Sequence, residues 1–445
     1  MVKDMTSGNI AKHLVLYSIP LILGNLFQLT YNAVDSIIVG RCAGESALAA
    51  VGAASPVMNI VILGINGLCI GASVLMSEFF GGNKESDFRR EFSTTLLFGT
   101  IFSLTVMVLG LLLSGPIMKL LSVPEEILDI CTLYLRIVFC GMPFTCFYNT
   151  YASGMRSVGD SKTPVNFLAF ASVLNGILDF LFIGIFHWGV AGAAIATVIA
   201  QAVSAILCVN YVYRKLPLLA LRRDEMKIYR DLLGKTLRHG SITALQQATQ
   251  PIGKLLIQGM VNELGVAAIA TFNAVSRVDD FAFTPEQSIS HGMMTFVAQN
   301  RGAKKKDRVR AGLRVGLTVE FCYWVIICIV ILTLRTPIMH LFASAEQTEM
   351  IALGSAYLLR MAFFYVMPAF TNGMQGFFRG IGNMKITFVS TFIQISLRVI
   401  FVALLMPRLG LVAVAYASVI GWACMLLYEV PFYFKHKKAG FNIAE

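Results

Sequence analysis

The sequence predicts an all-α membrane protein with about twelve transmembrane helices, arranged in two six-helix lobes related by a pseudo-two-fold axis along the membrane normal. Three observations lead to this fold class. The composition is apolar and poor in charge, apolar runs alternate with short basic loops, and segments of the first half recur about 220 residues later. Tandem halves of this kind are a recurring plan of membrane transporters.

The composition argues against a water-soluble globular chain. Of the 445 residues, 56% are hydrophobic and 14% are charged, whereas soluble domains are about 25% charged. The net charge of +11 does not indicate a nucleic-acid partner, because the basic residues lie in short loops between apolar runs. Those runs reach about 20 residues, which is enough to cross a bilayer. We therefore expect the lipid bilayer, and no nucleic acid, as a partner.

Twelve apolar runs are expected to cross the membrane as helices. They lie near residues 14–40, 46–79, 92–115, 127–155, 163–186, 189–213, 236–262, 266–299, 311–333, 347–377, 385–406 and 410–434. The second, eighth and tenth runs are long, which predicts helices that tilt or extend beyond the bilayer.

The charge of the loops predicts the orientation. Loops after even-numbered runs are basic, most densely at residues 214–238 and 301–314. Loops after odd-numbered runs contain few basic residues: Arg41, Lys119, Arg335 and Arg408. The positive-inside rule then predicts a multi-pass protein of the cell (plasma or inner) membrane with both termini in the cytoplasm.

The two halves of the sequence repeat one another. GGNKESD at 81–87 corresponds to RGAKKKD at 301–307, and GMRSVGDSK at 154–162 corresponds to FFRGIGNMK at 377–385. A repeat of six spans keeps its orientation, so the solute site is expected between the halves. This division gives an N-lobe at 1–213, a basic cytoplasmic linker at 214–235 and a C-lobe at 236–445.

Two acids lie well inside apolar runs of the N-lobe. Asp35 is in the first run and Asp179 in the fifth, at similar depth, and Asn175 precedes Asp179 by four residues on the same helical face. Thr197 in the sixth run offers a hydroxyl. Ionisable groups inside spans are costly and often functional. This oxygen-rich set could hold Na⁺ or trap a proton, and the alternative is a hydrogen-bonded polar core that only packs helices.

The C-lobe places cations where the N-lobe has acid and amide, since Asp35 aligns with Lys254 and Asn175 with Arg398. Further polar and ionisable residues of the seventh and eighth runs are Gln250, Arg277, Asp279, Asp280, Glu286 and His291. One interpretation is an internal ion-pair network of Lys254 and Arg398 with Asp279, Asp280 or Glu286. The other is a second ion pathway or a substrate cavity that tolerates anions.

No motif predicts an enzyme. The sequence has no Gly-rich phosphate loop in a strand–loop–helix context, no zinc-spaced His cluster and no nucleophile motif in a convincing context. We therefore expect neither ATP nor another cofactor, apart from a coupling ion, H⁺ or Na⁺. The 20 Met and 32 Phe residues suit an adaptable apolar cavity, although lipid contact and packing also account for them.

The order and spacing of several motifs resemble the multidrug and toxic compound extrusion (MATE) family, on its bacterial DinF-like side. The motifs are IPLILGNLFQLTYNAVDSIIVGRCAG, EFFGGNKESDFRR, GMRSVGDSKTP, NGILDFLFI and their second-half counterparts. The resemblance implies a cation-coupled antiporter that exports amphipathic small molecules by alternating access, and we expect a monomer. The family's cation-coupling residues match Asp35, Asn175, Asp179, Thr197 and Asn149. The acid that the NorM-like branch has in the seventh span has no match in QQATQPIGK.

Two other functions compete with secondary active multidrug export. A flippase for a lipid-linked precursor would need a cationic cavity, for which Lys254, Arg277 and Arg398 are candidates, but fourteen-span forms are common there and about twelve spans fit this chain. A signalling receptor or membrane enzyme is disfavoured by the tandem halves and by the lack of a catalytic constellation.

Overall fold

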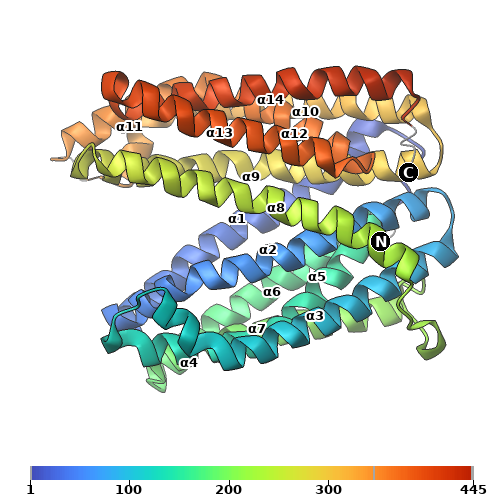
Figure 1. The fold of residues 1–445 in the computed structure, drawn as a ribbon, viewed down its shortest axis with the longest axis horizontal. Coiled ribbons are helices and arrows are strands. Elements are labelled where there is room, and N and C mark those ends of the chain that lie inside the picture. The colour runs from blue at the N-terminus through green and yellow to red at the C-terminus, as the bar shows by residue number, and fades with distance from the viewer. Residues whose placement is uncertain (1–2, 344–345, 442–445) are drawn as a thin grey trace. The chain divides into compact units, whose positions relative to one another are not determined.

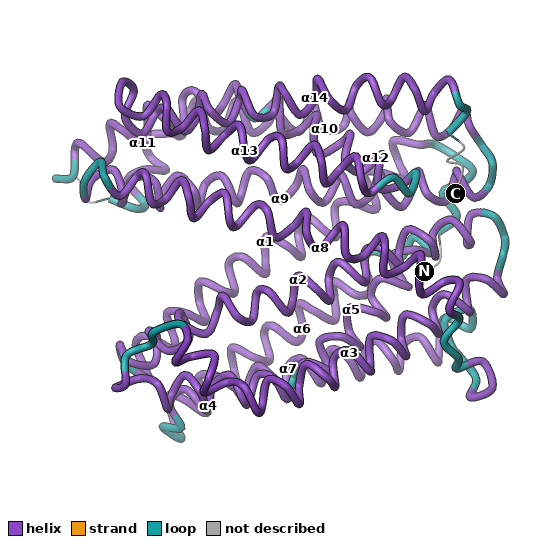
Figure 2. The backbone as a smooth tube through the Cα atoms, in the orientation of Figure 1, coloured by secondary structure: helices purple, strands orange, loops and turns teal. Residues whose placement is uncertain are grey.

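The computed structural model describes residues 3–343 and 346–441 and, at residues 33, 34, 36 and 45, the backbone alone. Within these ranges the chain forms helices joined by short loops, without strands (Figure 2). The first half contains α1 (Ile10–Ala43), α2 (Glu45–Gly81), α3 (Glu85–Leu120), α4 (Glu125–Cys140), α5 (Met142–Ser157), α6 (Lys162–Asp179), the π-helix η1 (Phe180–Ile185) and α7 (Gly189–Lys215). The second half contains η2 (Arg223–Glu225), α8 (Arg230–Asn262), α9 (Val266–Gly302), α10 (Lys306–His340), α11 (Thr348–Phe364), α12 (Val366–Gly380), α13 (Met384–Leu409), η3 (Gly410–Val412) and α14 (Ala413–Lys438) (Figure 1).

The all-helical membrane fold is confirmed. Among the described residues, seven helical stretches are long and apolar enough to cross a membrane, or nine if each of two bent helix pairs counts as one span. One of these stretches, Met384–Lys438, holds both α13 and α14, which lie side by side (Figure 1). The helices α8 and α9 are more polar, but they have 33 and 37 residues and coincide with the seventh and eighth expected spans.

Two spans expected as single helices are bent. The run near 127–155 forms α4 and α5, which meet at 42°, and the run near 347–377 forms α11 and α12, which meet at 47°. A proline follows each break, Pro143 in the first turn of α5 and Pro368 in that of α12. Proline lacks the N–H that would continue the preceding helix, and it is tolerated in a first turn.

Other helices continue past their apolar runs. The third run, near 92–115, lies within α3, which begins at Glu85, and the ninth, near 311–333, lies within α10, which begins at Lys306. Hydropathy marks the part of a helix that fits the bilayer core, whereas the backbone hydrogen bonds continue into the polar ends. Sequence reasoning therefore underestimated the lengths of these helices.

The chain divides into two compact units. Unit 1 comprises residues 1–4 and 23–244, and unit 2 comprises residues 5–22 and 245–445. Residues 5–22, which include the first part of α1, thus belong to unit 2. There Met5 N–H donates to Gln299 Oε1 at 3.0 Å, and the hydroxyls of Tyr17 and Thr295 are 3.1 Å apart. The division falls within α1 and within α8, so both helices contribute to each unit.

The backbone repeats between the two halves at its unusual positions. Gly44 before α2 and Gly265 before α9 have φ of 88° and 93°, and Asn83 and Lys304, just beyond those helices, have 54° and 57°. One further pair, Gly189 with Gly410, has the same offset of 221 residues, and another, Gly159 with Gly382, is 223 residues apart. A positive φ is uncommon outside glycine, so its recurrence supports the internal repeat more directly than the sequence matches do.

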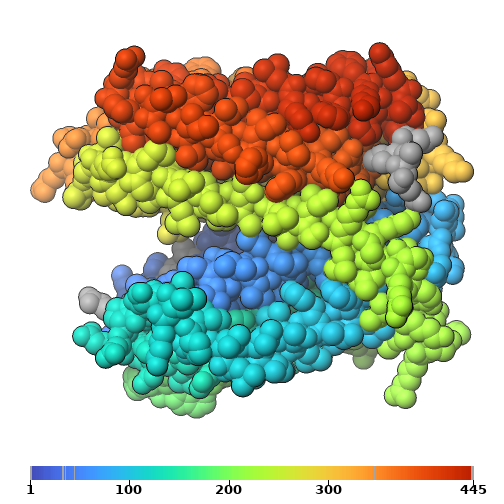
Figure 3. Space-filling view, in the orientation of Figure 1, coloured from blue at the N-terminus to red at the C-terminus, as the bar shows by residue number. Residues whose placement is uncertain are grey.

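Each unit has its own apolar interior and an apolar exterior. The largest core cluster of unit 2 includes Phe272, Tyr357 and Tyr365, and unit 1 has a cluster around Phe88 and Phe92. Many large apolar side chains also point outward, such as Leu404 of α13 and Leu427 of α14, which are 64% and 73% exposed. Figure 3 shows the surface that these two helices present. Exposed apolar surface of this extent is expected for helices that face lipid.

The basic segment before α8 is folded against α3 within unit 1. Arg89 of α3 donates to the carbonyl oxygens of Pro217 (2.7 Å) and Ala220 (2.8 Å) and forms an ion pair with Glu225. Ser93 also donates to the Glu225 carbonyl at 3.0 Å. The side-chain hydrogen bond from Arg89, followed by the backbone N–H of Arg222, lowers the pKa of Glu225 from 4.5 to about 2.

Candidate functional site

The candidate site of unit 1 is built on the end of α6. Asn175 and Asp179 are four residues apart and therefore share one face of that helix. Both are buried, with 7% and 0% of their surface exposed. Directly after Asp179 the helix widens into the π-helical turns of η1. Such π-helical turns are frequent at functional sites.

A tyrosine from α1 completes the contacts around this pair. The Tyr31 hydroxyl donates a hydrogen bond to Asn175 Oδ1 and also lies 3.4 Å from Asp179 Oδ2. Asn175 Nδ2 donates to the same Asp179 oxygen at 3.1 Å. Asp179 Oδ2 therefore accepts from two side chains on two helices.

The second oxygen of Asp179 has a different surrounding. Asp179 Oδ1 is buried and has no hydrogen-bond donor among the described residues. The half-buried Asp35 of α1 is the charged neighbour of Asp179, with its carboxyl in hydrogen-bonding contact. Two carboxyls can form such a contact only when one of them carries a proton. Tyr134 of α4 also lies near both acids.

Two of the predicted site residues are turned to their own helices. Thr197 Oγ1 donates to the Ala193 carbonyl at 2.9 Å, and Asn149 Nδ2 donates to the Thr145 carbonyl at 2.9 Å. No hydrogen bond among the described residues joins either side chain to Asp35 or Asp179. The structure thus brings together Asp35, Asn175 and Asp179 but not Thr197 or Asn149.

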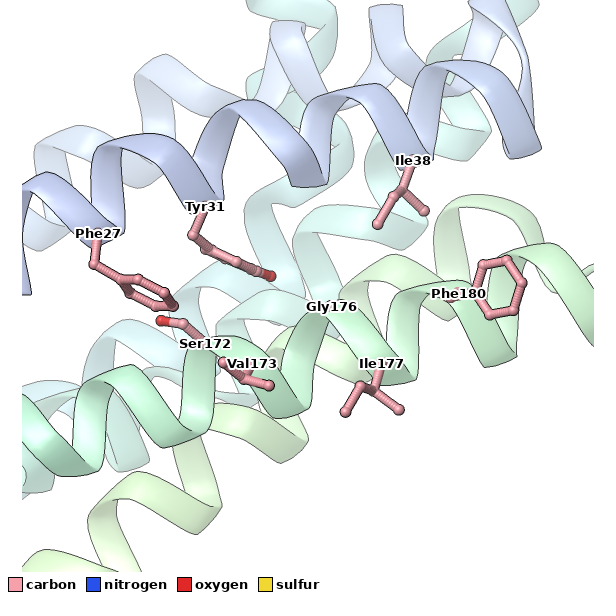
Figure 4. A pocket seen from close by; sticks show the side chains of 8 residues that line it. All are labelled: Phe27, Tyr31, Ile38, Ser172, Val173, Gly176, Ile177 and Phe180. Atoms are coloured by element: carbon pink, nitrogen blue, oxygen red, sulfur yellow. The ribbon is translucent and has the colours of Figure 1, made fainter.

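An apolar groove lies between α1 and α6 beside this cluster (Figure 4). Its volume is about 420 Å³. The lining residues are Phe27, Tyr31, Ile38, Ser172, Val173, Gly176, Ile177 and Phe180. Tyr31 lines the groove and also contacts Asn175 and Asp179, so it connects an aromatic surface to the buried carboxylate.

In unit 2 the buried aspartate is held by tyrosines. Asp279 of α9 accepts from the Tyr365 hydroxyl at 2.5 Å and from the Tyr357 hydroxyl at 3.1 Å. Arg398 of α13 is its cationic neighbour. These contacts bring together two members of the charge network that the sequence predicted.

A second ion pair of unit 2 joins Lys254 of α8 to Asp280, with 3.7 Å between Nζ and Oδ2. Both side chains are about half exposed, at 51% and 52%, so this pair is not buried, unlike the internal ion-pair network that the sequence predicts. Arg277 and Gln250 are also exposed, and His291 is half-buried.

Several buried polar residues were not singled out from the sequence. Tyr31 could have been found, because it precedes Asp35 by four residues and therefore shares its helical face. Three glutamates inside helices are also fully buried: Glu91, Glu320 and Glu429. Glu320 and Glu429 lie within apolar runs and are detectable by the same search for intramembrane acids that found Asp35.

Glu429 of α14 belongs to a polar network with partners on several helices. Its Oε1 accepts from Ser390 at 2.8 Å, and Arg379 is its cationic neighbour. Arg379 donates to Gln246 at 3.1 Å and to Gln375 at 3.2 Å. This network lies entirely within unit 2 and satisfies most of its buried groups, which is what a packing role requires.

Comparison with known proteins identifies the relatives of the chain. The profile of the MatE family matches twice, over residues 20–181 and 243–404. The chain is 31% identical to a probable multidrug resistance protein, YpnP, of Bacillus subtilis, over 92% of this chain and 91% of that protein. It is 30% identical to a second one, YoeA, of the same organism, over 76% and 74% of the two chains.

A solved structure described as MATE in complex with MaL6 has the same fold. Its TM-score is 0.91, its sequence identity is 21%, and the match covers 98% of both chains. At this identity the likeness concerns the fold alone.

Proposed function

The chain belongs to the MatE family of membrane transporters, and we propose that it exports amphipathic organic compounds by antiport with protons. The observation that carries this proposal is the carboxyl pair Asp35 and Asp179 inside unit 1. Asp179 is fully buried, and its Oδ1 has no donor among the described residues. A proton placed between the two carboxyls supplies that donor and removes one buried charge.

The surroundings of the pair favour H⁺ over Na⁺. A bound metal cation needs several oxygen ligands at once. Thr197 and Asn149 donate to their own helices, and Tyr31 and Asn175 present donors to Asp179. We therefore assign the coupling role to a proton.

The groove beside the pair supports the class of transported compound. It presents the rings of Phe27, Tyr31 and Phe180, which suit flat apolar molecules. Aromatic faces also attract organic cations, and Asp179 supplies negative charge when its proton leaves. Proton binding and compound binding would then oppose each other, which is what antiport requires.

The flippase alternative is less well supported. The cations that could bind a pyrophosphate have anionic neighbours in unit 2, Asp280 for Lys254 and Asp279 for Arg398. The proposal also includes a monomer in the cell membrane with both termini in the cytoplasm. Cysteines introduced at Arg222 and Lys437 should resist labelling from outside sealed cells, and labelling of either would contradict this orientation.

The test of the proposed function uses purified protein in liposomes loaded with a fluorescent organic cation. An imposed pH gradient should drive its movement, and an imposed Na⁺ gradient at equal pH should not. Asp35→Asn should remove the response to the pH gradient while the protein remains folded and inserted. Transport driven by Na⁺ alone, or an unchanged rate in the variant, would overturn the proposal.

A further inference from the structure

A second group of acids lies inside unit 2, on two helices that pack against each other. Glu286 of α9 and Glu320 of α10 both have 0% of their surface exposed. The two carboxyls are electrostatic neighbours. Neither is among the residues to which the proposed function gives a role.

The oxygens of these acids lack donors. Glu286 Oε2 accepts from Asn372 Nδ2 of α12 at 3.2 Å. Glu286 Oε1 and both carboxyl oxygens of Glu320 are buried and have no hydrogen-bond partner among the described residues. Buried polar groups are normally hydrogen-bonded, and a buried ionised carboxylate needs a partner more than any neutral group does. Three oxygens without donors therefore require an explanation.

The remaining neighbours do not neutralise the pair. Tyr323 of α10 lies near both acids, but its hydroxyl donates to the Ala282 carbonyl at 2.9 Å. Tyr365 lies near Glu286, but its hydroxyl donates to Asp279. Asn372 Nδ2 donates both to Glu286 and to the Pro368 carbonyl oxygen, which lies 2.9 Å from it.

Packing does not require acids at these positions. With the offset that relates Gly44 to Gly265 and Asn83 to Lys304, Glu286 corresponds to Ile65 and Glu320 to Gly99. Unit 1 thus builds the same two helices with residues that cannot ionise. Close packing also keeps the site tight, since a Cβ added at Gly373 would meet Leu317 at 2.7 Å and the Glu320 side chain at 3.7 Å.

We propose that Glu286 and Glu320 form a proton-binding site within unit 2, separate from the carboxyl pair of unit 1, whose proton exchanges with water. A proton on either acid removes the repulsion between two buried negative charges and turns one oxygen into a donor. Asn372 donates to Glu286 alone, which favours Glu286 as the acid that remains ionised and Glu320 as the one that takes the proton. The tight, dry packing leaves little room for a hydrated metal cation, so the ligand is the proton itself.

The test counts titrating carboxyls by infrared difference spectroscopy between about pH 5 and 9, a range in which buried glutamates exchange protons. The protein is the full chain carrying Asp35→Asn, Asp179→Asn and Glu91→Gln, so that the buried acids of unit 1 do not contribute. We expect a carboxyl band that titrates, and we expect Glu320→Gln to remove it. His291, which is five residues from Glu286, is distinguished by its imidazole bands.

A matched control is Glu429→Gln, which replaces another fully buried glutamate of the same unit that has a Ser390 donor. It should leave the band in place. If Glu320→Gln does not fold, Glu286→Gln serves as the second variant. Two results would overturn the proposal. The first is a spectrum without a titrating carboxyl band, and the second is a band that Glu429→Gln abolishes while Glu320→Gln and Glu286→Gln leave it intact. Because this measurement needs no transport, its outcome is independent of the proposed coupling by Asp35 and Asp179.

Discussion

The two units each bury an aspartate beside tyrosine, yet they surround it with opposite charge. In unit 1, Asp179 of α6 meets the hydroxyl of Tyr31 and a second acid, Asp35. In unit 2, Asp279 of α9 meets the hydroxyls of Tyr357 and Tyr365 and a cation, Arg398. In the function that we propose, the first arrangement binds a proton and releases it when conditions change. The second is already neutralised, so it holds helices together.

The internal repeat therefore preserves the helices but not the positions of the ionisable groups. At the offset of the motif GMRSVGDSK, Asn175 corresponds to Arg398 and Asp179 to Val402. The equivalents of the unit 1 site are thus a cation and an apolar residue. Unit 2 instead carries its acids on α9 and α10, at positions where unit 1 has Ile65 and Gly99.

The largest effect is expected on transport, when the buried aspartate of unit 1 is replaced. Asp179→Asn should abolish transport driven by a pH gradient, because an amide cannot exchange a proton and the site then has the same charge in both states. The measurement is efflux of a fluorescent cation from liposomes, with circular dichroism to show that the helices remain. Gradient-driven efflux at the wild-type rate would mean that the unit 1 pair is not the coupling element.

The corresponding change in unit 2 should act on stability instead. Asp279→Leu removes the anionic neighbour of the half-buried Arg398. Stranding one member of a fully buried pair costs about 3–5 kcal/mol, which sets the upper limit of the loss expected here. Thermal unfolding in detergent should detect this loss, and Arg398→Met added to Asp279→Leu should recover part of it. If the single variant is as stable as the wild type, the two groups do not form a neutralised pair.

A smaller effect is expected at the exposed pair of unit 2. Lys254→Met removes a partner of Asp280, but both side chains are about half exposed. Exposed ion pairs contribute about 0–1 kcal/mol, so the unfolding temperature should change much less than in Asp279→Leu. A loss as large as that of Asp279→Leu would show that Lys254 is desolvated when the protein is in the membrane.

The smallest effect concerns the basic segment that folds against α3. Hydrogen bonding to Arg89 holds the pKa of Glu225 at about 2, below its ordinary 4.5. A carboxyl with a lowered folded pKa stabilises the fold above its unfolded pKa and loses that contribution as pH falls through the folded value. The contact is therefore complete at pH 7 and weakens from about pH 4.5 towards pH 2.

An acid-active protease should thus cut residues 216–229 faster as the pH falls through this range, after correction for its own pH profile. The contribution is about 1 kcal/mol or less, as for other partly exposed ion pairs. Glu225→Gln should be cut at a rate that no longer depends on this titration. A wild-type profile without change would mean that the segment is held by contacts other than the Arg89–Glu225 ion pair, such as the hydrogen bonds from Arg89 to backbone carbonyls.

The sequence was sufficient for the fold class and for part of the site. Apolar runs and basic loops predict the helices because lipid and water impose the pattern residue by residue. Asp35, Asn175 and Asp179 were found because an acid inside a span is conspicuous and because residues four apart share a helical face. The breaks after Cys140 and Phe364 were missed, since hydropathy does not change where the helix bends.

Contacts between distant helices were harder to predict. The sequence does not show that the Thr197 hydroxyl and the Asn149 amide form hydrogen bonds with the backbone of their own helices. Side-chain rotamers depend on the neighbouring helices, which the sequence does not place. The partner of Lys254 was left open among three acids, and the structure selects Asp280. Tyrosines were overlooked because a hydroxyl adds little to the charge pattern, although Tyr31 and Tyr365 each contact a buried aspartate.

The place of residues 5–22 in unit 2 has a consequence for biosynthesis. Residues 5–22 pack against the end of α9, where Tyr17 meets Thr295 across 278 residues of sequence and Met5 meets Gln299 across 294. A ribosome adding about 5–20 residues per second needs on the order of 15–60 s to make that stretch. The start of α1 therefore lacks its contacts with α9 while the whole of the first half of the chain is translated. Chaperones or the insertion machinery would meet the nascent protein with this end of its first helix still uncovered.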